Sequence, residues 1–570
     1  MNKDRLLAHY GRIADAPDAI ARLRRFILDL AVRGKLVPQD PKHEPASELL
    51  KRIAKEKARL SSGQPKRGRR SPDGRGRTEE FAFMPPAGWA LSTLGEVALK
   101  ITDGTHQTPT YVRNGVPFVS IKDFSAGRLD LSNTRFITDE EHRVLYKRCD
   151  PKRGDILIGR IGTLGRAVLI DTDQEFSLFV SVGLIRFSHQ TIVPDFFRML
   201  LNSPLVEREF NRIKIGGGTH TNKLNLGDLQ TVAIPLPPLA EQHRIVAKVE
   251  ELMALCERLE AARAGREAVC DRLAAAILAR LNAPDPETFH DDARFALNAL
   301  PTLTTRPDQI KQLRQTILNL AVRGRLVPQD PNDEPASELL TSIATGKAER
   351  RRKTADARIK IEPDPKPEDL PTELPQGWAV QSFENLFLFI DYRGNTPPKT
   401  NEGIPLITAK NIKMGYLNRE PREYISQKTF KTWMTRGFPE IGDLFFTTEA
   451  PLANICLNDI NEPFALAQRA ICFQPYGTID TKFLMFALMS DLMQSLIDAH
   501  ATGMTAKGIK AAKLKPLPIP IPPLAEQHRI VSKVDELMAL CDRLEVSLAA
   551  ASTTRRRLLD ALLAEALAPG

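Results

Sequence analysis

A run of four polar residues, Glu241-Gln242-His243-Arg244, contains side-chain types that act in general acid–base catalysis. The same run returns at Glu526 to Arg529, so it serves the same purpose twice. Each copy follows a double proline and opens a long proline-free segment, which predicts the first turn of a helix. We favour a structural role, because an acid there complements the helix dipole. The functional alternative is contact with a partner subunit, with candidates Glu241, Gln242, Arg244, Glu526, Gln527 and Arg529.

The rest of the sequence offers no recognisable catalytic motif. It contains no (N/D)PP(Y/F) tetrapeptide, no glycine-rich methyl-donor loop after a strand and no Walker lysine, and no acidic cluster recurs between the two copies. The six cysteines form no CxxC pair and no histidine cluster accompanies them, so neither a metal site nor a disulfide framework is expected. We therefore predict no catalytic residue, no metal site and no cofactor bound by this chain.

The sequence around these residues is built from two similar halves. PPLAEQHRIV begins at Pro237 and again at Pro522, and LAVRGKLVPQDP from Leu30 returns as LAVRGRLVPQDP from Leu320. A repeat of about half the chain indicates a duplicated domain rather than a solenoid. The segments between the repeats differ. Repeated segments must do one job twice, whereas dissimilar ones are expected to face different targets.

Each half begins with predicted helices. Apolar residues from Ile20 to Ala31 recur at helical spacing before Gly34 and Pro38 end the segment, and a twin is expected at about 308–323. Shorter helices are expected at about 46–60 and about 336–352. The linkers that follow, KRGRRSPDGRGR and KIEPDPKPEDLP, are typical of solvated tethers rather than of DNA-binding tails.

The middle of each half is rich in short β-type runs. PPAGWALSTLGEV opens the first region and LPQGWAVQSFENL the second. The runs VPFVSI, GDILIGRIG and FVSVGLIRF follow in the first, and IPLITA, GDLFFTT and RAICFQP in the second, with Gly, Pro and Asn between them. We expect two compact domains of mixed α and β structure.

A long helix closes each half. Residues 239–282 contain no proline, and Ile245, Val249, Leu252, Cys256 and Leu259 form a coiled-coil seam that resumes at Cys270, Leu273 and Ile277. Its twin carries Ile530, Val534, Leu537, Cys541 and Leu544. Such a helix could span roughly 65 Å and is predicted to act as a spacer. Because an arm begins each half and a long helix ends it, the first arm and the last helix should meet, and the two termini should lie close together.

Charge and hydropathy indicate the class of partner. A formal charge of +10 and a sequence pI near 9.2 favour a polyanion, with nucleic acid first, although such a balance often reflects solubility alone. The first residues lack an apolar signal core, and no run of 18 apolar residues occurs. We expect a cytoplasmic protein without a membrane partner.

The arrangement resembles the DNA-specificity subunit of type I restriction–modification systems. The paired PPLAEQHRIV segments, the paired LAVRG(K/R)LVPQDP arms and the PxGW openings carry the resemblance, which covers nearly the whole chain. It implies an α+β fold in which two α/β target-recognition domains are separated by long antiparallel coiled-coil helices with pseudo-two-fold symmetry. The implied segments are 1–77 (arm and linker), 78–236 (first recognition domain), 237–366 (long helix, second arm and linker), 367–520 (second recognition domain) and 521–570 (last long helix).

The resemblance also implies a function. Each recognition domain would read one half of a bipartite, asymmetric site in double-stranded DNA, while the helices set the spacing and dock two methyltransferase (modification) subunits. The chain would direct methylation, usually of adenine at N6, and, with a restriction (translocase) subunit, cleavage. S-adenosylmethionine, ATP and Mg are expected on the partner subunits.

Loops in the two recognition domains carry side chains that suit base edges or phosphates. The DNA-binding candidates are Thr105, His106, Gln107, Lys122, Arg160, Thr163, Thr219, His220, Asn222 and Lys223 in the first domain, and Arg393, Asn395, Lys399, Lys410, Asn411, Thr448, Glu449, Thr505, Lys507 and Lys510 in the second. The charge difference between Arg160 and Glu449 is of the kind that two different half-sites require. Surface hairpins with ordinary turn chemistry are the structural alternative.

Two other functions remain open from the sequence. A self-sufficient methyltransferase or nuclease with an unrecognised motif would transfer methyl groups or cleave DNA as the purified chain alone. A coiled-coil scaffold whose inserts bind proteins would show no salt-sensitive, sequence-specific DNA binding in its assembled complex.

Overall fold

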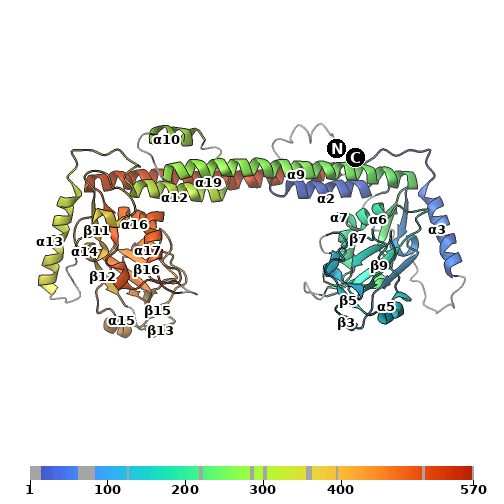
Figure 1. Ribbon diagram of the computed structural model, residues 1–570, viewed down its shortest axis with the longest axis horizontal. Coiled ribbons are helices and arrows are strands. Elements are labelled where there is room, and N and C mark those ends of the chain that lie inside the picture. Colours follow the sequence, from blue (N-terminus) through green and yellow to red (C-terminus); the bar gives the residue numbers. More distant parts are fainter. Residues whose placement is uncertain are drawn as a thin grey trace. The chain divides into compact units, whose positions relative to one another are not determined.

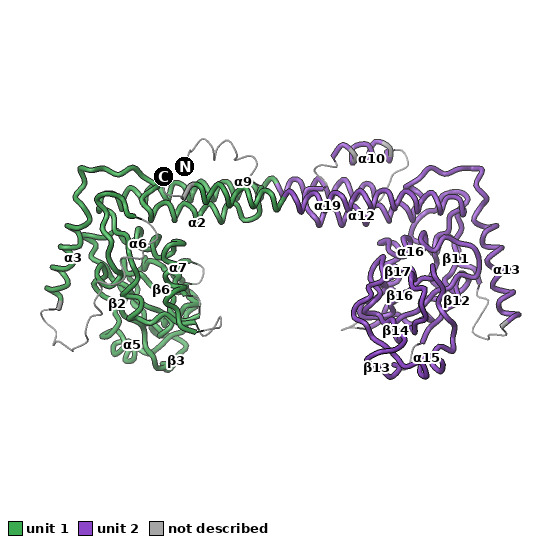
Figure 2. The backbone as a smooth tube through the Cα atoms, turned by 180° about the vertical axis from the view of Figure 1, so that it is seen from behind, with its two compact units in different colours: residues 1–266, 552–570 green, residues 267–551 purple. Residues whose placement is uncertain are grey.

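The computed structural model describes residues 15–61, 84–124, 127–162, 164–216, 222–282, 288–299, 304–354, 363–392, 396–503 and 507–567. The chain divides into two compact units, which Figure 2 colours separately. Unit 1 comprises residues 1–266 and 552–570, and unit 2 comprises residues 267–551. Both long helices cross the division, so each unit contains parts of both. The linker at 66–77 and the two chain ends lie outside the described residues.

The helices of unit 1 pair the first arm with the last helix, as the repeat predicts. These helices are α2 (Ala19–Val32), α3 (Ala46–Ser61), the first part of α9 (Leu239–Asn282) and the end of α19 (Leu524–Leu567). Arg24 of α2 forms a 2.7 Å ion pair with Glu260 of α9, and Arg22 forms another with Asp560 of α19. Apolar side chains from both ends of the chain pack together beside this contact, namely Ala16, Ala19, Leu559 and Leu562.

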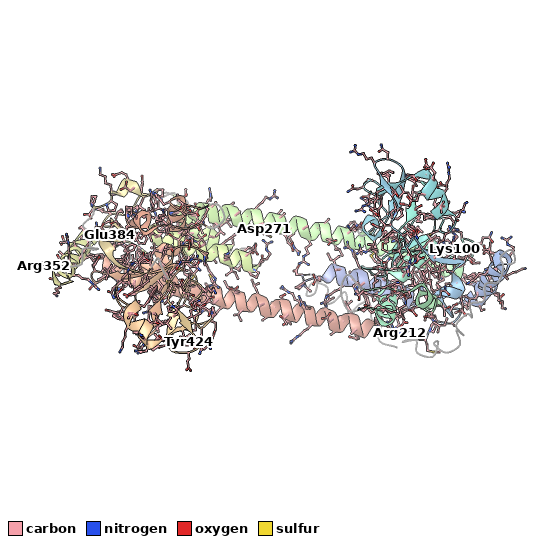
Figure 3. The ribbon with its side chains drawn as sticks, turned by 90° about the horizontal axis from the view of Figure 1, so that it is seen from below. Lys100, Arg212, Asp271, Arg352, Glu384 and Tyr424 are labelled. Atoms are coloured by element: carbon pink, nitrogen blue, oxygen red, sulfur yellow. The ribbon has the colours of Figure 1, made fainter. Side chains whose placement is uncertain are left out.

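Unit 2 repeats this arrangement. Its helices are α10 (Phe289–Asn298), α12 (Pro307–Val322), α13 (Ala336–Thr354), the end of α9 and the first part of α19. Arg314 of α12 reaches Asp542 and Glu545 of α19 at 2.7 and 2.8 Å. Arg306 pairs at 2.7 Å with Asp271, a residue of the last part of α9 (Asp271 is labelled in Figure 3). Helix α10 was not predicted from the sequence.

The mixed domain of unit 1, called domain 1 (residues 84–236), contains two four-stranded sheets. The first has the order β2-β9-β6-β7 and is antiparallel, and the second has the order β3-β5-β4-β8 with a parallel β4–β8 pair. An antiparallel pair, β1 with β10, joins the start of the domain to its end. The strands are β1 (Ala90–Thr93), β2 (Lys100–Asp103), β3 (Tyr111–Val112), β4 (Val116–Val119), β5 (Arg135–Ile137), β6 (Ile156–Gly159), β7 (Ala167–Leu169), β8 (Ser177–Leu178), β9 (Val182–Arg186) and β10 (Ala233–Leu236). The helices are α4 (Leu94–Val97), η3 (Ile121–Phe124), α5 (Asp139–Tyr146), α6 (Pro194–Leu201), α7 (Pro204–Ile213) and α8 (Leu226–Gln230).

The mixed domain of unit 2, called domain 2 (residues 363–521), has the same topology despite its different sequence. Its sheets are β12-β19-β16-β17 and β13-β15-β14-β18, and β11 pairs with β20. The strands are β11 (Ala379–Ser382), β12 (Phe387–Asp391), β13 (Lys399–Thr400), β14 (Ile404–Ile407), β15 (Tyr424–Ile425), β16 (Leu444–Thr447), β17 (Ile455–Leu457), β18 (Ala465–Leu466), β19 (Ala470–Pro475) and β20 (Pro518–Ile521). The helices are η4 (Pro367–Asp369), α14 (Phe383–Leu386), α15 (Gln427–Trp433), α16 (Thr481–Met489), α17 (Asp491–Ala499) and α18 (Ala511–Leu514). The fold is therefore α+β with an internal repeat.

Each short arm helix is fixed to the domain that follows it. Helices α3 and α13 each lie along one side of their own mixed domain (Figure 1). Lys347 of α13 is buried and donates to the Glu384 carbonyl at 3.0 Å and to Asn385 Oδ1 at 2.8 Å. Lys57 makes the equivalent contacts to the carbonyls of Gly95 and Glu96, and burial lowers its pKa.

The predicted seam of the long helices is largely confirmed. Ile245, Val249 and Cys256 are buried, and the matching residues of α19 are buried as well. The prediction fails at Leu273, which is 39% exposed, whereas the neighbouring Ala274 is buried. Ile277, further along the helix, is buried as predicted, so the departure is confined to the Leu273 position of the resumed seam. None of the described helices is both long enough and apolar enough to cross a membrane.

Candidate nucleic-acid interface

The repeated motifs meet at one junction in each unit, where the arm, the domain opening and the long helix come together. Gly34 has a φ of 67°, and a Cβ atom there would lie 2.4 Å from Pro86 Cγ and 3.1 Å from Trp89. Gly324 has a φ of 63° and the same relation to Pro375, again at 2.4 Å. Only glycine combines this backbone conformation with such a close approach. The LAVRG motif is thus packed against the PxGW motif.

The buried glutamate of the long helix completes the junction. Gln39 Nε2 donates to Glu241 Oε1 at 2.9 Å, and Gln329 Nε2 donates to Glu526 Oε1 at 2.8 Å. Trp378 Nε1 also donates to Glu526, at 3.0 Å. Burial raises the pKa of Glu526, while these two hydrogen bonds work in the opposite direction. The VPQDP segment of each arm is therefore hydrogen-bonded to the start of its long helix.

The buried glutamines bind the start of another helix. Gln242 Oε1 accepts the N–H of Val193 at 2.9 Å, and Gln527 Oε1 accepts that of Asp480 at 2.9 Å, just before α6 and α16 begin. The amide nitrogens of the same side chains also donate hydrogen bonds. Gln242 Nε2 donates to the Pro237 carbonyl at 3.1 Å, and Gln527 Nε2 donates to the Pro522 carbonyl at 2.9 Å, each proline being the first residue of its PPLAEQ motif. Gln242 and Gln527 thus join the domain to its long helix.

These contacts correct part of the partner-subunit prediction. Four of the predicted partner-contact residues are between 0% and 2% exposed and so cannot contact another chain. These are Glu241, Gln242, Glu526 and Gln527. Their hydrogen bonds within the unit give them a structural role. Arg244 is half-buried and donates to the Pro38 carbonyl at 2.9 Å, and Arg529 is half-buried and pairs with Asp333 at 3.1 Å. Both arginines also serve the junction.

The first loop of domain 1 presents polar side chains at its surface. His106 and Gln107 are exposed, and His106 Nε2 lies 3.0 Å from Asp103 Oδ2. Thr105 is half-buried, and its hydroxyl donates to the Gln107 carbonyl at 3.2 Å. Lys122 is exposed beyond β4. These four side chains remain candidates for DNA contact.

Arg160 does not remain one. It is 3% exposed, forms an ion pair with Asp103, and donates from Nε to the Leu224 carbonyl at 3.1 Å. Arg148 binds the same carboxylate from the other side. Through these partners, the Arg160 guanidinium joins the end of β2 to the end of β6. The sequence could not reveal this role, because Asp103 lies 57 residues away from Arg160.

Domain 2 has exposed lysines at the corresponding loops. Lys410 is 70% exposed, and its Nζ lies 3.7 Å from Glu423, to which Lys399 is bound at 2.7 Å. The prediction is wrong for Asn411, which is 1% exposed. Its Oδ1 accepts the N–H of Thr408 at 3.0 Å, so this side chain fixes the turn that presents Lys410.

The next loop of domain 2 also differs from the prediction. Thr448 is 4% exposed, and its N–H donates to the Arg469 carbonyl at 3.0 Å, so it is not a base-contacting residue. Glu449 is 39% exposed and pairs with the Arg469 side chain. Lys507 is exposed but bound to Asp498 at 2.6 Å, and Lys510 is exposed before α18. Glu449 and the two lysines remain candidates.

The turn after β6 and the loop before α8 lie side by side in domain 1. Lys223 forms isolated β-bridges with Ile161 and Ile215, and the Asn222 carbonyl accepts the N–H of Gly162 at 3.1 Å. Domain 2 repeats this bridge pattern, with Gly508 between Glu449 and Thr502. The remaining candidates lie outside the described residues: Thr163, Thr219, His220, Arg393, Asn395 and Thr505.

A partly buried charge network in domain 1 was not predicted. Arg186 of β9 lies 2.6 Å from Asp155 and 3.1 Å from Asp150, and Lys100 lies 2.6 Å from Asp150. Burial opposes ionisation of Asp150, but the hydrogen bonds from Lys100 and Arg186 lower its pKa to about 2. In domain 2, Asp443 occupies the position of Asp155, and burial raises the pKa of the Asp443 carboxyl to about 6. The matched GDIL and GDLF runs mark these carboxylates in the sequence.

The described residues include no group of three or more His, Cys, Asp or Glu side chains that could hold a metal ion. What the two domains present instead is a set of exposed polar and basic loops on a common framework.

Comparisons with known proteins give the family. The model of the type I restriction modification DNA specificity domain matches residues 86–264 and 375–550. The chain is 31% identical to the type I restriction enzyme EcoAI specificity subunit of Escherichia coli, over 95% of this chain and 93% of that protein. It is 29% identical to the EcoEI specificity subunit of Escherichia coli, over 96% and 94%.

A crystal structure of the HsdS subunit from Thermoanaerobacter tengcongensis is similar with a TM-score of 0.42 and 21% identity, over 85% of this chain and 98% of that one. Since the family match covers both repeats and the EcoAI alignment spans nearly the whole chain, the protein belongs to the family of type I restriction–modification DNA specificity subunits.

Proposed function

We propose that this non-catalytic specificity subunit reads a bipartite, asymmetric site in double-stranded DNA, with one half read by each domain. The observation that carries the proposal is that two domains of identical topology present different side chains at equivalent loops. The turn after β6 of domain 1 holds the half-buried Ile161, whereas the equivalent turn after β16 of domain 2 holds Glu449 in a surface pair with Arg469. Sequence is read through such side-chain differences, while the common framework supplies position.

A domain exchange tests this function. Residues 367–520 are replaced by the equivalent segment of another specificity subunit, and the methylated motif in the host genome is determined with wild-type chain, with the chimera and without the chain. We expect one half of the motif to change with the chimera and the whole motif to disappear without the chain. If both halves change, or if neither does, the division of reading between the domains is wrong.

We also propose that the chain docks two modification subunits at equivalent surfaces. The VPQDP segment supports this, because residues 38–41 and residues 328–331 have identical sequences and are exposed in both units. An identical exposed turn beside each long helix offers two equal docks to one partner. Asp40 and Asp330 are the charged residues of these turns.

Native mass spectrometry of the complex tests the docking. Asp40→Lys or Asp330→Lys alone should lower the number of modification subunits per chain from two to one, and the double variant should bind none. Lys42→Asn is the matched control, because it gives the first turn the residue found at Asn332. Full occupancy in the double variant would place the dock elsewhere.

The partner subunits are proposed to supply the chemistry. The modification subunit would carry S-adenosylmethionine and methylate adenine at N6, and the restriction subunit would use ATP and Mg. Methyl transfer to DNA by the purified chain alone would refute this division and support the self-sufficient enzyme.

A further inference from the structure

Unit 1 contains a cavity of about 400 Å³ where helix α2, helix α7 and the turn after β6 meet. Three cationic side chains line it, Arg25, Arg166 and Lys214, and each of them is exposed. The apolar part of the lining includes Phe210, which is 4% exposed and belongs to the core. The cavity therefore has one wall formed by a buried core side chain and a basic rim that is accessible to solvent.

The turn that forms one wall is held in place. Gly165 has a φ of 76°, and a Cβ atom there would lie 2.5 Å from the ring of Phe210. The Gly165 N–H donates to the Gly159 carbonyl at 2.9 Å, and Gly162 is tied to Asn222 at 3.1 Å. A wall fixed in this way needs little reorganisation when a ligand binds.

The charges of the cavity suit an anion. Among the described residues the lining contains one carboxylate, Glu207, which binds Arg25 at 2.6 Å. Lys214 uses one of its three donors on Asn211, at 3.0 Å. Arg166 brings a guanidinium, whose planar donors match two oxygens of a phosphate. Three cations against one carboxylate leave a positive surplus with donors to spare.

In unit 2 the same framework carries neutral residues where unit 1 has these cations. The equivalent positions, aligned by the arm repeat, the matched GD strands and the serine caps of α7 and α17, hold Gln315, Asn454 and Ala501. Gln315 donates to the Met489 carbonyl at 3.1 Å, and Asn454 donates to that of Ile412 at 3.0 Å. The same framework thus forms with neutral residues, so the three cations of unit 1 serve another purpose.

We propose that this cavity binds one backbone phosphate of the DNA beside the half-site read by domain 1. The proposal rests on the proposed function, because the loops that border the cavity at Gly162 and Asn222 belong to the candidate reading surface. The phosphate contact orients domain 1 on the duplex without reading a base. No equivalent contact is expected from domain 2, so the two half-sites are held unequally.

The test measures DNA binding by the complete complex with its modification subunits over a range of salt concentrations. Arg166→Gln with Lys214→Gln should make the slope of log K against log salt less steep by about 0.9, the value for one neutralised phosphate. Affinity should fall by the same factor for target and non-target DNA, because a phosphate contact carries no sequence information. Arg208→Gln with Arg212→Gln is the matched control, since both residues are exposed on α7 but do not line the cavity (Figure 3 labels Arg212).

A second arm distinguishes a DNA phosphate from a free phosphate ion. Neutral methylphosphonates are placed one at a time along the target. A methylphosphonate at one position should weaken DNA binding by the wild-type complex and leave DNA binding by the Arg166→Gln, Lys214→Gln complex unaffected. Added inorganic phosphate should not restore the affinity that the wild-type complex loses at that position.

An unchanged salt slope in the cavity variant, or an equal change in the control variant, would overturn the proposal. So would a loss of modification subunits from the cavity variant, which would make the cavity a protein dock. If the wild-type complex does not bind DNA with a salt-dependent affinity, the proposed function itself fails, and that result is distinct from all of these.

Discussion

Asp443 should make the stability of domain 2 depend on pH in the opposite direction from an ordinary ion-paired carboxylate. It is 4% exposed, and its Oδ2 accepts the Glu440 N–H at 2.7 Å and the Gln474 amide at 3.2 Å. In domain 1 the place of Gln474 is taken by Arg186, which binds Asp155 at 2.6 Å. Without such a cation, burial raises the pKa of Asp443 from 3.8 to about 6.

The sign and size of the effect follow from this shift. A carboxyl with a raised pKa in the folded state disfavours folding once it ionises, so the stability is fully present below pH 3.8 and falls as the pH rises through 6. Asp443→Asn cannot ionise and escapes this loss. Relative to wild type, its free energy of unfolding should gain about 1.4 kcal/mol between pH 5 and pH 7.5, out of a total of about 3 kcal/mol at neutral pH.

Cysteine labelling measures this difference within one domain. Cys456 is 0% exposed on β17 of domain 2, and Cys149 is 5% exposed in domain 1, so each reacts when its own domain opens. The ratio of wild-type to variant labelling rates cancels the intrinsic pH dependence of the thiol. For Cys456 the ratio should rise about tenfold between pH 5 and pH 7.5, which corresponds to 1.4 kcal/mol, while that for Cys149 should stay near one. A Cys456 ratio that does not vary with pH would refute the reasoning.

Three further predictions concern the junctions and the reading loops. Trp378→Phe should lower the urea midpoint of its unit by the equivalent of about 1–2 kcal/mol, because it removes a hydrogen bond from a buried carboxylate, whereas Trp89→Phe should cost less, since Trp89 Nε1 has no partner among the described residues. Gly324→Ala should lower the free energy of unfolding by about 1–3 kcal/mol in thermal denaturation, because of its positive φ and the 2.4 Å approach of a proline ring; Gly265→Ala, in open space within helix α9, should instead stabilise. Lys410→Gln should reduce the salt slope of DNA binding by about 0.9 without changing the methylated motif, as measured by titration and by sequencing of methylated DNA.

The helices and strands could be predicted because local signals specify them. The double proline before Leu239 and the proline-free segment after it gave the bounds of α9, and the arms ended at Gly34 and Gly324 as expected. The six β-type runs each became a strand, since alternation and flanking turn residues act within a few positions. The topology of the two sheets depends on pairing between distant segments, and no local signal specifies it.

Burial in the candidate site could not be predicted for the same reason. Arg160 and Asn411 have side chains that suit DNA, but distant or neighbouring partners occupy them inside the fold. Lys122 and Lys410 are exposed because each lies in a turn that a neighbouring side chain fixes. Asp123 accepts the Ser120 N–H in the first turn, and Asn411 accepts the Thr408 N–H in the second. Residue type gave the chemistry of each side chain, whereas its accessibility depended on partners that only the tertiary structure brings together.

Identity between the two halves does not by itself distinguish an internal junction from an external dock, because a duplicated protein needs both of them twice. Exposure makes the distinction. Glu241 and Gln242 are repeated and buried, so their substitution should disturb domain placement, and through it both DNA reading and assembly. Asp40 is repeated and exposed within the same set of motifs, so its substitution should disturb assembly alone. The repeated residues therefore separate into two functional classes that the sequence shows as one.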